Sequence, residues 1–223
     1  MNIGIIGAGP MGTALARHLT RLDHEVASAS PRGAASLSEV VRDRDLVILA
    51  IPTQVVATLP RTLFATVPTS VIVIDVGNYH PELRDGRIAA IEAGLLDSQW
   101  VAERIGHPVI KAFNNIFAQS LLENAVPKGD SRRIALPVSG DSVTARSVVL
   151  RLIDDIGFDP VDAGDLDGGF RHATGTPAYC KDLDEVALRR ALAAAEPGRV
   201  AEYRAAEEER IRLALRTAPL GAA

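Results

Sequence analysis

Three glycines at fixed spacing stand near the start of the chain. Gly7, Gly9 and Gly12 follow a short apolar run and precede a segment with helical apolar spacing, which predicts a strand, a tight turn and a helix. In such a turn Gly7 allows the sharp bend, Gly9 lets the backbone approach a diphosphate, and Gly12 lets the helix pack on the strand. The diphosphate would lie beside Pro10 and Met11, at the positive end of the helix dipole. The motif predicts a dinucleotide-binding site.

The end of the second predicted strand, which begins at Glu25, bears on the choice of cofactor. An Asp or Glu there would bond the free ribose hydroxyls and repel a 2′-phosphate, but neither is present. The segment instead offers the Ser30 hydroxyl and the Arg32 guanidinium, which suit a phosphate. We therefore predict NADPH. The alternative is that Ser30 and Arg32 form an ordinary exposed turn and that either cofactor is accepted.

Further candidate site residues follow the later strands. In an open parallel sheet the ligand lies beyond the carboxyl ends of the strands. Ile51 and Pro52 are predicted to form an apolar floor along the cofactor path. Gly77 and Ala112 end two neighbouring strands and are predicted to lie beside the same path.

Asn78, Lys111 and Asn114 are the candidate catalytic residues. Each Asn could hold the nicotinamide carboxamide or the acceptor by hydrogen bonds, or could simply cap a local turn. Lys111 is unusual because a charge inside a strand must be paired or face a site. It could meet a developing negative charge on the acceptor, or pair with an acid such as Asp75.

Hydride transfer between a nicotinamide and another planar ring needs the two rings placed face to face and little proton transfer from the protein. A dedicated acid or base is then optional. His80 and His172 are therefore secondary candidates, although either could help to cover an aromatic acceptor. The histidines and the one cysteine show no metal-ligand spacing, so no metal site is predicted.

These residues need an α/β framework to position them. Apolar runs alternate with helical or polar segments, and most are continuous rather than alternating, as expected of strands buried on both faces. We predict a Rossmann-type doubly wound, mostly parallel sheet. The predicted strands cover residues 2–6, 25–28, 46–51, 71–76, 109–113, 134–138 and 160–162.

Two regions are predicted. A dinucleotide-binding Rossmann domain covers residues 1–165, and a small C-terminal extension, residues 166–223, is expected to complete the acceptor site. The extension begins as a loop rich in Gly, Asp and Thr and continues as two helices broken near Pro197. The many charges on these helices predict a solvated face.

Composition excludes several classes of function. The chain has 223 residues, 47% of them hydrophobic, and a net charge of −4 with no long basic run, so nucleic-acid binding is not expected. No apolar stretch approaches the roughly 18 residues of a membrane helix. The single Cys180 rules out an internal disulfide, and we expect a cytoplasmic protein. A homodimer is plausible because so short a chain often completes its acceptor pocket with a neighbour.

Several segments together resemble the coenzyme F420-dependent NADP oxidoreductases and their bacterial relatives. The resemblance rests on the glycine turn, on Ala50-Ile51-Pro52 and on the segments 109–115, 136–141 and 158–164. It implies a Rossmann fold, NADP, and coenzyme F420 or a flavin as co-substrate. Pro31 stands where many relatives have the phosphate-binding Arg, so Arg32 would take over that role. Segment 169–180 resembles the bacterial relatives rather than the characterised reductases of the family.

The leading hypothesis is an NADPH-dependent oxidoreductase that exchanges hydride with a flavin or a deazaflavin, a small-molecule acceptor. An NADPH-dependent reductase of a small carbonyl or imine compound is the alternative within enzymes. A non-catalytic NADP-binding sensor module is the alternative of a different class.

Overall fold

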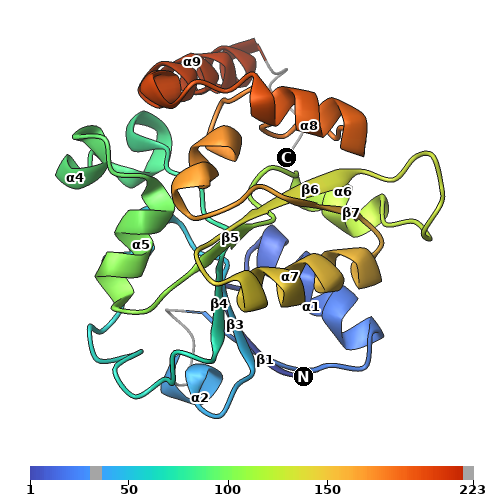
Figure 1. Cartoon of the computed structure of the whole chain (residues 1–223). Helices are drawn as coiled ribbons and strands as arrows, with labels where there is room; N and C mark the ends of the chain where they lie inside the picture. The colour runs from blue at the N-terminus through green and yellow to red at the C-terminus, as the bar shows by residue number, and fades with distance from the viewer. Residues whose placement is uncertain (31–36, 218–223) are drawn as a thin grey trace.

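The computed structural model describes residues 1–30 and 37–217, and these residues build one α/β sandwich (Figure 1). Over this part of the chain the sheet has seven strands in the order β2-β1-β3-β4-β5-β6-β7. The predicted doubly wound, mostly parallel sheet is therefore present. The strands are β1 (Asn2–Ile6), β2 (Glu25–Ala29), β3 (Leu46–Leu49), β4 (Ile72–Asp75), β5 (Ile110–Ala112), β6 (Ala135–Ser139) and β7 (Asp159–Asp162).

Strands β1 to β5 run parallel, whereas β6 is antiparallel to β5 and β7 runs parallel to β6. Lys111 pairs with Ser139, and Ala112 with Val138, so the chain re-enters the sheet at the end where β5 leaves it. A parallel pair would need a crossover that returns the chain to the opposite edge. The one helix between β5 and β6, α6 (Ala118–Glu123), is too short for that.

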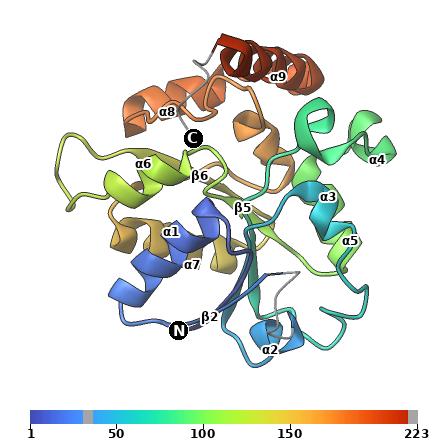
Figure 2. The ribbon, with the colours of Figure 1, turned by 180° about the vertical axis from the view of Figure 1, so that it is seen from behind.

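Helices cover both faces of the sheet, as the rotated view in Figure 2 also shows. One face buries apolar side chains against α1, α6 and α7, and the other against α2, α3 and α5. Ser142 caps α7, and Gly157 ends it. The helices of this part are α1 (Pro10–Arg21), α2 (Leu37–Val41), α3 (Thr53–Val56), α4 (Ala89–Glu92), α5 (Asp97–Ile105), α7 (Val143–Ile156) and the π-helical turn η1 (Pro81–Asp85).

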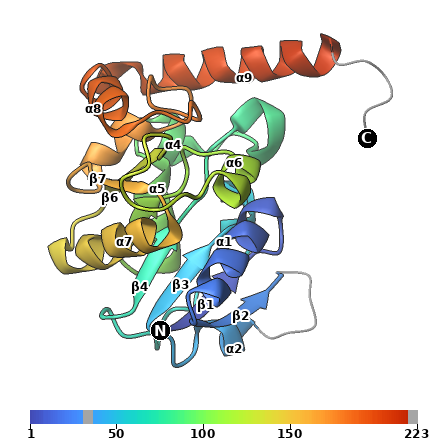
Figure 3. The ribbon, with the colours of Figure 1, turned by 90° about the vertical axis from the view of Figure 1, so that its right-hand side faces the viewer.

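The chain after β7 lies at the end of the molecule opposite the N-terminus, beyond the carboxyl end of β1 (Figure 3). Leu188 and Leu192 of α8 pack on Ala135 and Val161, so α8 shares a core with β6 and β7. The two predicted helices are present and are separated by a 3-10 turn at Pro197. The elements of this segment are η2 (Asp167–His172), α8 (Glu185–Ala193), η3 (Pro197–Arg199) and α9 (Val200–Thr217).

None of the helices in the described ranges 1–30 and 37–217 has the length and apolar character needed to cross a bilayer.

Candidate functional site

The glycine turn between β1 and α1 has the geometry that each glycine position requires. Gly7 has a φ of +129°, and a Cβ on it would lie 2.1 Å from the carbonyl oxygen of Ala50 at the end of β3. A Cβ on Gly12 would lie 2.1 Å from the Gly7 carbonyl oxygen, so this glycine sets the close packing of α1 on the turn. Gly9 differs, because nothing lies within 4 Å of its Cβ position. The backbone at Gly9 is thus open to a ligand.

A hollow of about 480 Å³ lies over the first turn of α1 and is walled on its far side by α6. Gly9, Pro10 and Thr13 line one wall, and Leu122 lines the other. The first turn of α1 carries no acidic side chain, and Pro10 occupies its N-terminal position. Backbone N–H groups in a first helical turn have no partner within the helix, which suits an anion such as a diphosphate.

Strand order places this turn at the topological switch point of the sheet. From β1 the chain goes first to β2 on one side and then to β3 on the other, so the loops after β1 and β3 diverge. Ser30 directly follows β2, on the side where the adenosine half of a dinucleotide lies in this fold. Arg32, the other predicted phosphate-binding residue, lies outside the described residues.

On the other side of the switch point the predicted floor residues Ile51 and Pro52 follow β3, and Gly77 and Asn78 follow β4. Ile51 is buried and Pro52 is half-buried at the start of α3, where the chain leaves β3 earlier than predicted. Gly77 and Asn78 are half-buried just after β4. A Cβ on Gly77 would lie 3.0 Å from Asp75 Oδ1, so the turn after β4 is tight. Of these four residues, Pro52, Gly77 and Asn78 keep partly exposed surface.

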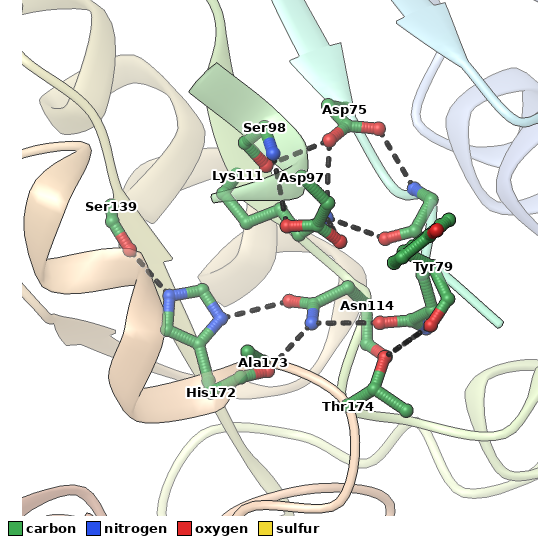
Figure 4. A network of polar contacts seen from close by, with 12 residues as sticks. Asp75, Tyr79, Asp97, Ser98, Lys111, Asn114, Ser139, His172, Ala173 and Thr174 are labelled. Carbon is green, nitrogen blue, oxygen red and sulfur yellow. Dashed lines mark hydrogen bonds and ion pairs between the residues drawn. The ribbon is translucent and has the colours of Figure 1, made fainter. Parts of the chain in front are cut away.

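Lys111 points into a buried cluster of charges at the end of β4 (Figure 4). Its Nζ lies 3.0 Å from Asp75 Oδ2 and 3.1 Å from Asp97 Oδ2, and it donates a 2.5 Å hydrogen bond to the Gly77 carbonyl oxygen. Ser98 Oγ donates to the same oxygen of Asp75. Burial alone would lower the pKa of Lys111, but the two carboxylates outweigh it and raise that pKa. Lys111 is therefore a charged support for the turn that carries Gly77.

Asn114 lies in a second buried network (Figure 4). Its Nδ2 donates to the His172 carbonyl oxygen at 2.7 Å and to Asn78 Oδ1 at 3.2 Å, while its Oδ1 lies 2.8 Å from His172 Nδ1. On the other side of the imidazole, Nε2 contacts Ser139 Oγ. Asn78 completes the link by donating from Nδ2 to the Asn114 carbonyl oxygen at 2.8 Å.

Three of the predicted site residues are thus enclosed within the protein. Lys111 and Asn114 are each 1% exposed and Ala112 is 0% exposed. Asn114, just beyond β5, is also bonded to His172 of η2. Of the predicted catalytic trio, Asn78 alone keeps exposed surface. Lys111 does pair with Asp75, one of the two alternatives that the sequence left open.

The C-terminal extension is fastened over the loop that follows Asn78. Arg204 of α9 forms an ion pair with Glu92 at 3.1 Å, and its guanidinium lies 4.8 Å from the centre of the Tyr79 ring. Glu208 Oε1 accepts the backbone N–H groups of Glu82 and Leu83, the open first turn of η1. Arg204 and Glu208 are buried, while the other charged residues of α9 are exposed or half-buried, so the helix has the predicted solvated face and a second face that packs on the protein.

Several supporting residues carry no local signal in the sequence. Asp97 begins a helix and Ser139 ends a strand, and isolated polar residues are common at both kinds of position. The residues that they contact lie far away in the sequence. A buried Lys does imply acidic partners, and that signal pointed to Asp75 but could not find Asp97. His172 was a secondary candidate, as a proton donor or as part of a cover for an aromatic acceptor, whereas the structure encloses both of its ring nitrogens inside the protein.

His172 predicts a pH dependence of stability. Burial, with help from the nearby Lys111 ammonium, lowers its pKa to about 3 from an ordinary 6.5. Between these values the unfolded chain binds a proton that the folded chain does not, so stability falls as the pH drops below about 6.5, by up to ~1.4 kcal/mol per pH unit. Urea denaturation at several pH values gives the free energy of unfolding as a function of pH. Its slope below pH 6.5 should be smaller in His172→Asn than in the wild type by that amount. Equal slopes in the two proteins would contradict this assignment.

Comparison with known proteins agrees with this architecture. The family model described as "NADP oxidoreductase coenzyme F420-dependent" matches residues 2–79, which include the glycine turn and the turn after β4. A solved protein of unassigned function from Sinorhizobium meliloti, SMa0349, is 30% identical, with a TM-score of 0.66. The match covers 83% of this chain and 96% of that one. The chain belongs to this family of NADP oxidoreductases. The predicted family is thereby confirmed.

Two further similarities place the chain among its relatives. The Escherichia coli (strain K12) protein YjhV is 37% identical over 75 residues, 34% of this chain, and the chain spans about half (55%) of that curated relative. A structure from Arthrobacter sp. FB24, a proposed F420-dependent NADP reductase, is 19% identical with a TM-score of 0.55. That match covers 74% of this chain and 85% of the other, and it confirms the Rossmann-type fold.

Proposed function

We propose that the protein transfers hydride between NADPH and a flavin or deazaflavin (coenzyme F420) acceptor. The open backbone at Gly9, framed by two glycines whose Cβ positions are blocked, is the observation that carries the cofactor half of this proposal. The family supports the acceptor half. A planar tricyclic acceptor needs orientation rather than a protein acid, and the enclosed network behind Asn78 supplies rigid positioning.

The residues then have distinct roles. The turn of Gly7, Gly9 and Gly12 with Pro10 and Met11 holds the diphosphate. Ser30 and Arg32 hold the 2′-phosphate. The nicotinamide lies over Ile51, Pro52 and Gly77, with Asn78 at its carboxamide. Lys111, Ala112 and Asn114 act from behind as positioning residues, and the extension from residue 166 onward closes the acceptor side through its contacts with the loop after Asn78.

A panel of acceptors tests the proposal. Anaerobic NADPH oxidation is followed with coenzyme F420, FMN, FAD, a cyclic imine and a small ketone, each supplied alone. We expect the fastest turnover with the deazaflavin or a flavin. NADPH binding without turnover on any acceptor would contradict the proposal and favour an NADP-binding sensor module.

Reduction of a small imine or carbonyl compound is a second candidate. Such a reduction places a proton on nitrogen or oxygen, so it gains from a donor beside the nicotinamide. The Tyr179 hydroxyl lies 3.4 Å from His80 Nε2, two residues from Asn78, and both side chains are at least half-buried. Turnover of the imine or ketone above that of the flavins in the same panel would favour this candidate.

The cofactor preference gives a separate prediction. Ser30→Asp combined with Arg32→Ala places a carboxylate where the 2′-phosphate is proposed to lie and removes its cation. The kcat/KM ratio of NADPH to NADH should fall by about ten- to a hundredfold, the loss of one or two charge-assisted hydrogen bonds. Ser28→Asp, which adds the same charge on the exposed side of β2, is the matched control and should leave the ratio nearly unchanged. An unchanged ratio in the double variant would contradict the proposed phosphate site.

A further inference from the structure

His172 occupies an unusual place for a histidine near a proposed hydride-transfer site. It ends η2, the first element of the C-terminal extension, and is 0% exposed. Its ring stands between Ser139 Oγ of β6 and Asn114 Oδ1 beyond β5, and its own carbonyl oxygen accepts from Asn114 (Figure 4). His172 thus contacts both the NH₂ group and the oxygen of the Asn114 amide.

These contacts fix the orientation of the amide and the position of the imidazole proton. A backbone carbonyl oxygen can only accept, so the group of Asn114 that faces the His172 carbonyl oxygen must be its NH₂. Asn114 Oδ1 then faces His172 Nδ1, which must carry the proton. Nε2 is left as an acceptor for the Ser139 hydroxyl. His172 is thus held as the neutral tautomer protonated on Nδ1.

The same reasoning carries the orientation outward to the surface. Asn114 Nδ2 donates to Asn78 Oδ1, and Asn78 Nδ2 donates to the Asn114 carbonyl oxygen. The amide of Asn78 can therefore lie only one way round. Its second N–H has no acceptor among the residues of the described ranges, and Asn78 is the outermost member of the chain of contacts.

We propose that His172 is a positioning residue that, through the Asn114 amide and together with the Asn114 carbonyl oxygen, holds Asn78 so that it presents an N–H donor, and not an acceptor, to the nicotinamide carboxamide oxygen. This inference rests on the proposed placement of NADPH over β3 and β4. The C-terminal extension then orients a cofactor-binding residue indirectly, because His172 bonds Asn114 and Asn114 bonds Asn78, and His172 does not contact the ligand itself. The nicotinamide carboxamide accordingly binds with its oxygen, rather than its amino group, toward Asn78.

Binding of NADPH relative to 2′-phospho-ADP-ribose, which lacks the nicotinamide, isolates the contact at Asn78. The ratio of the dissociation constant of 2′-phospho-ADP-ribose to that of NADPH, which is the advantage of NADPH, is measured by calorimetry on the full chain, without any acceptor. His172→Gln, whose amide matches the Nε2 rather than the Nδ1 position, should reduce the advantage of NADPH about three- to tenfold, the loss of one neutral hydrogen bond. His172→Asn, whose amide can restore an N–H at the Nδ1 position, should recover most of it.

Ser139→Ala is the matched control. It removes the other hydrogen bond of the same ring, so it should lower stability without lowering the ratio. A ratio that is unchanged in His172→Gln, lowered as much in Ser139→Ala, or near one in the wild type would overturn the inference. Failure of the proposed function would appear separately, as absence of turnover in the acceptor panel.

The wild-type protein provides a measurement that does not depend on any variant folding. Long-range nitrogen–proton NMR spectra of the imidazole should show a protonated Nδ1 and an unprotonated Nε2 on His172. The opposite tautomer would overturn the relay, because Nδ1 could then no longer donate to Asn114 Oδ1.

Discussion

Replacing Lys111 by methionine is expected to lower the free energy of unfolding by about 3–5 kcal/mol, the usual loss when one partner of a buried ion pair is removed. Methionine keeps most of the side-chain volume, so the change removes charge rather than packing. What remains is a pair of carboxylates, Asp75 and Asp97, that both bound the same ammonium and are largely shielded from water. The measurement is urea denaturation at neutral pH.

Two further variants separate the charge from the shape of the side chain. Lys111→Arg keeps a cation and should lose less stability than Lys111→Met, although its larger head must fit an enclosed site. Adding Asp97→Asn to Lys111→Met removes one of the unpaired charges and should recover part of the loss. A Lys111→Met protein within about 0.5 kcal/mol of the wild type, the range of an ordinary surface substitution, would contradict the ion-pair account.

The effect should also reach the proposed ligand surface. Lys111 Nζ binds the Gly77 carbonyl oxygen directly, so its loss frees the turn that carries Asn78. NADPH affinity should fall more than the affinity for 2′-phospho-ADP-ribose, which lacks the nicotinamide. The glycine turn, which is proposed to hold the diphosphate of both ligands, follows β1 and should keep its geometry. Equal losses for the two ligands would indicate a general loss of structure rather than a local one.

Local features of the fold could be predicted from the sequence, and long-range pairings could not. The glycine turn depends on neighbours within a few residues, so the spacing of Gly7, Gly9 and Gly12 was enough to predict β1 and α1. The direction of β6 depends instead on how the chain between β5 and β6 returns to the sheet. Continuous apolar runs look the same in either direction, so only the structure revealed the antiparallel pair.

The candidate site divides in the same way. Asn78, Lys111 and Asn114 could be proposed because each follows or lies within a predicted strand at the expected edge. Their partners come from elsewhere: Asp97 from the start of α5, and His172 from 58 residues beyond Asn114. A sequence pattern contains no information about which distant polar groups meet, so the supporting role of Lys111 and Asn114 required the structure.

Gly9→Ala provides the sharpest test of the cofactor site, because it should affect the ligand and spare the fold. Gly9 has a φ of −76° and a ψ of −179°, which alanine adopts readily, and its Cβ would meet no protein atom within 4 Å. Stability should therefore change by less than about 0.5 kcal/mol. The methyl group would instead stand in the hollow over α1, between the diphosphate and the N–H groups that bind it. NADPH affinity should fall about ten- to a hundredfold, the loss of one or more charge-assisted hydrogen bonds.

Gly12→Ala is the counterpart that should affect the fold first. Its Cβ would lie 2.1 Å from the Gly7 carbonyl oxygen, a backbone atom that cannot move without opening the turn. We expect a loss of about 1–3 kcal/mol from overpacking, even though alanine favours a helix more than glycine does. In thermal unfolding Gly12→Ala should thus be the less stable of the two variants, and in NADPH titration Gly9→Ala should lose affinity at unchanged stability. If Gly9→Ala bound NADPH as the wild type does, the diphosphate could not lie against this turn, and the proposed path of the cofactor from Ser30 to Asn78 would be wrong as well.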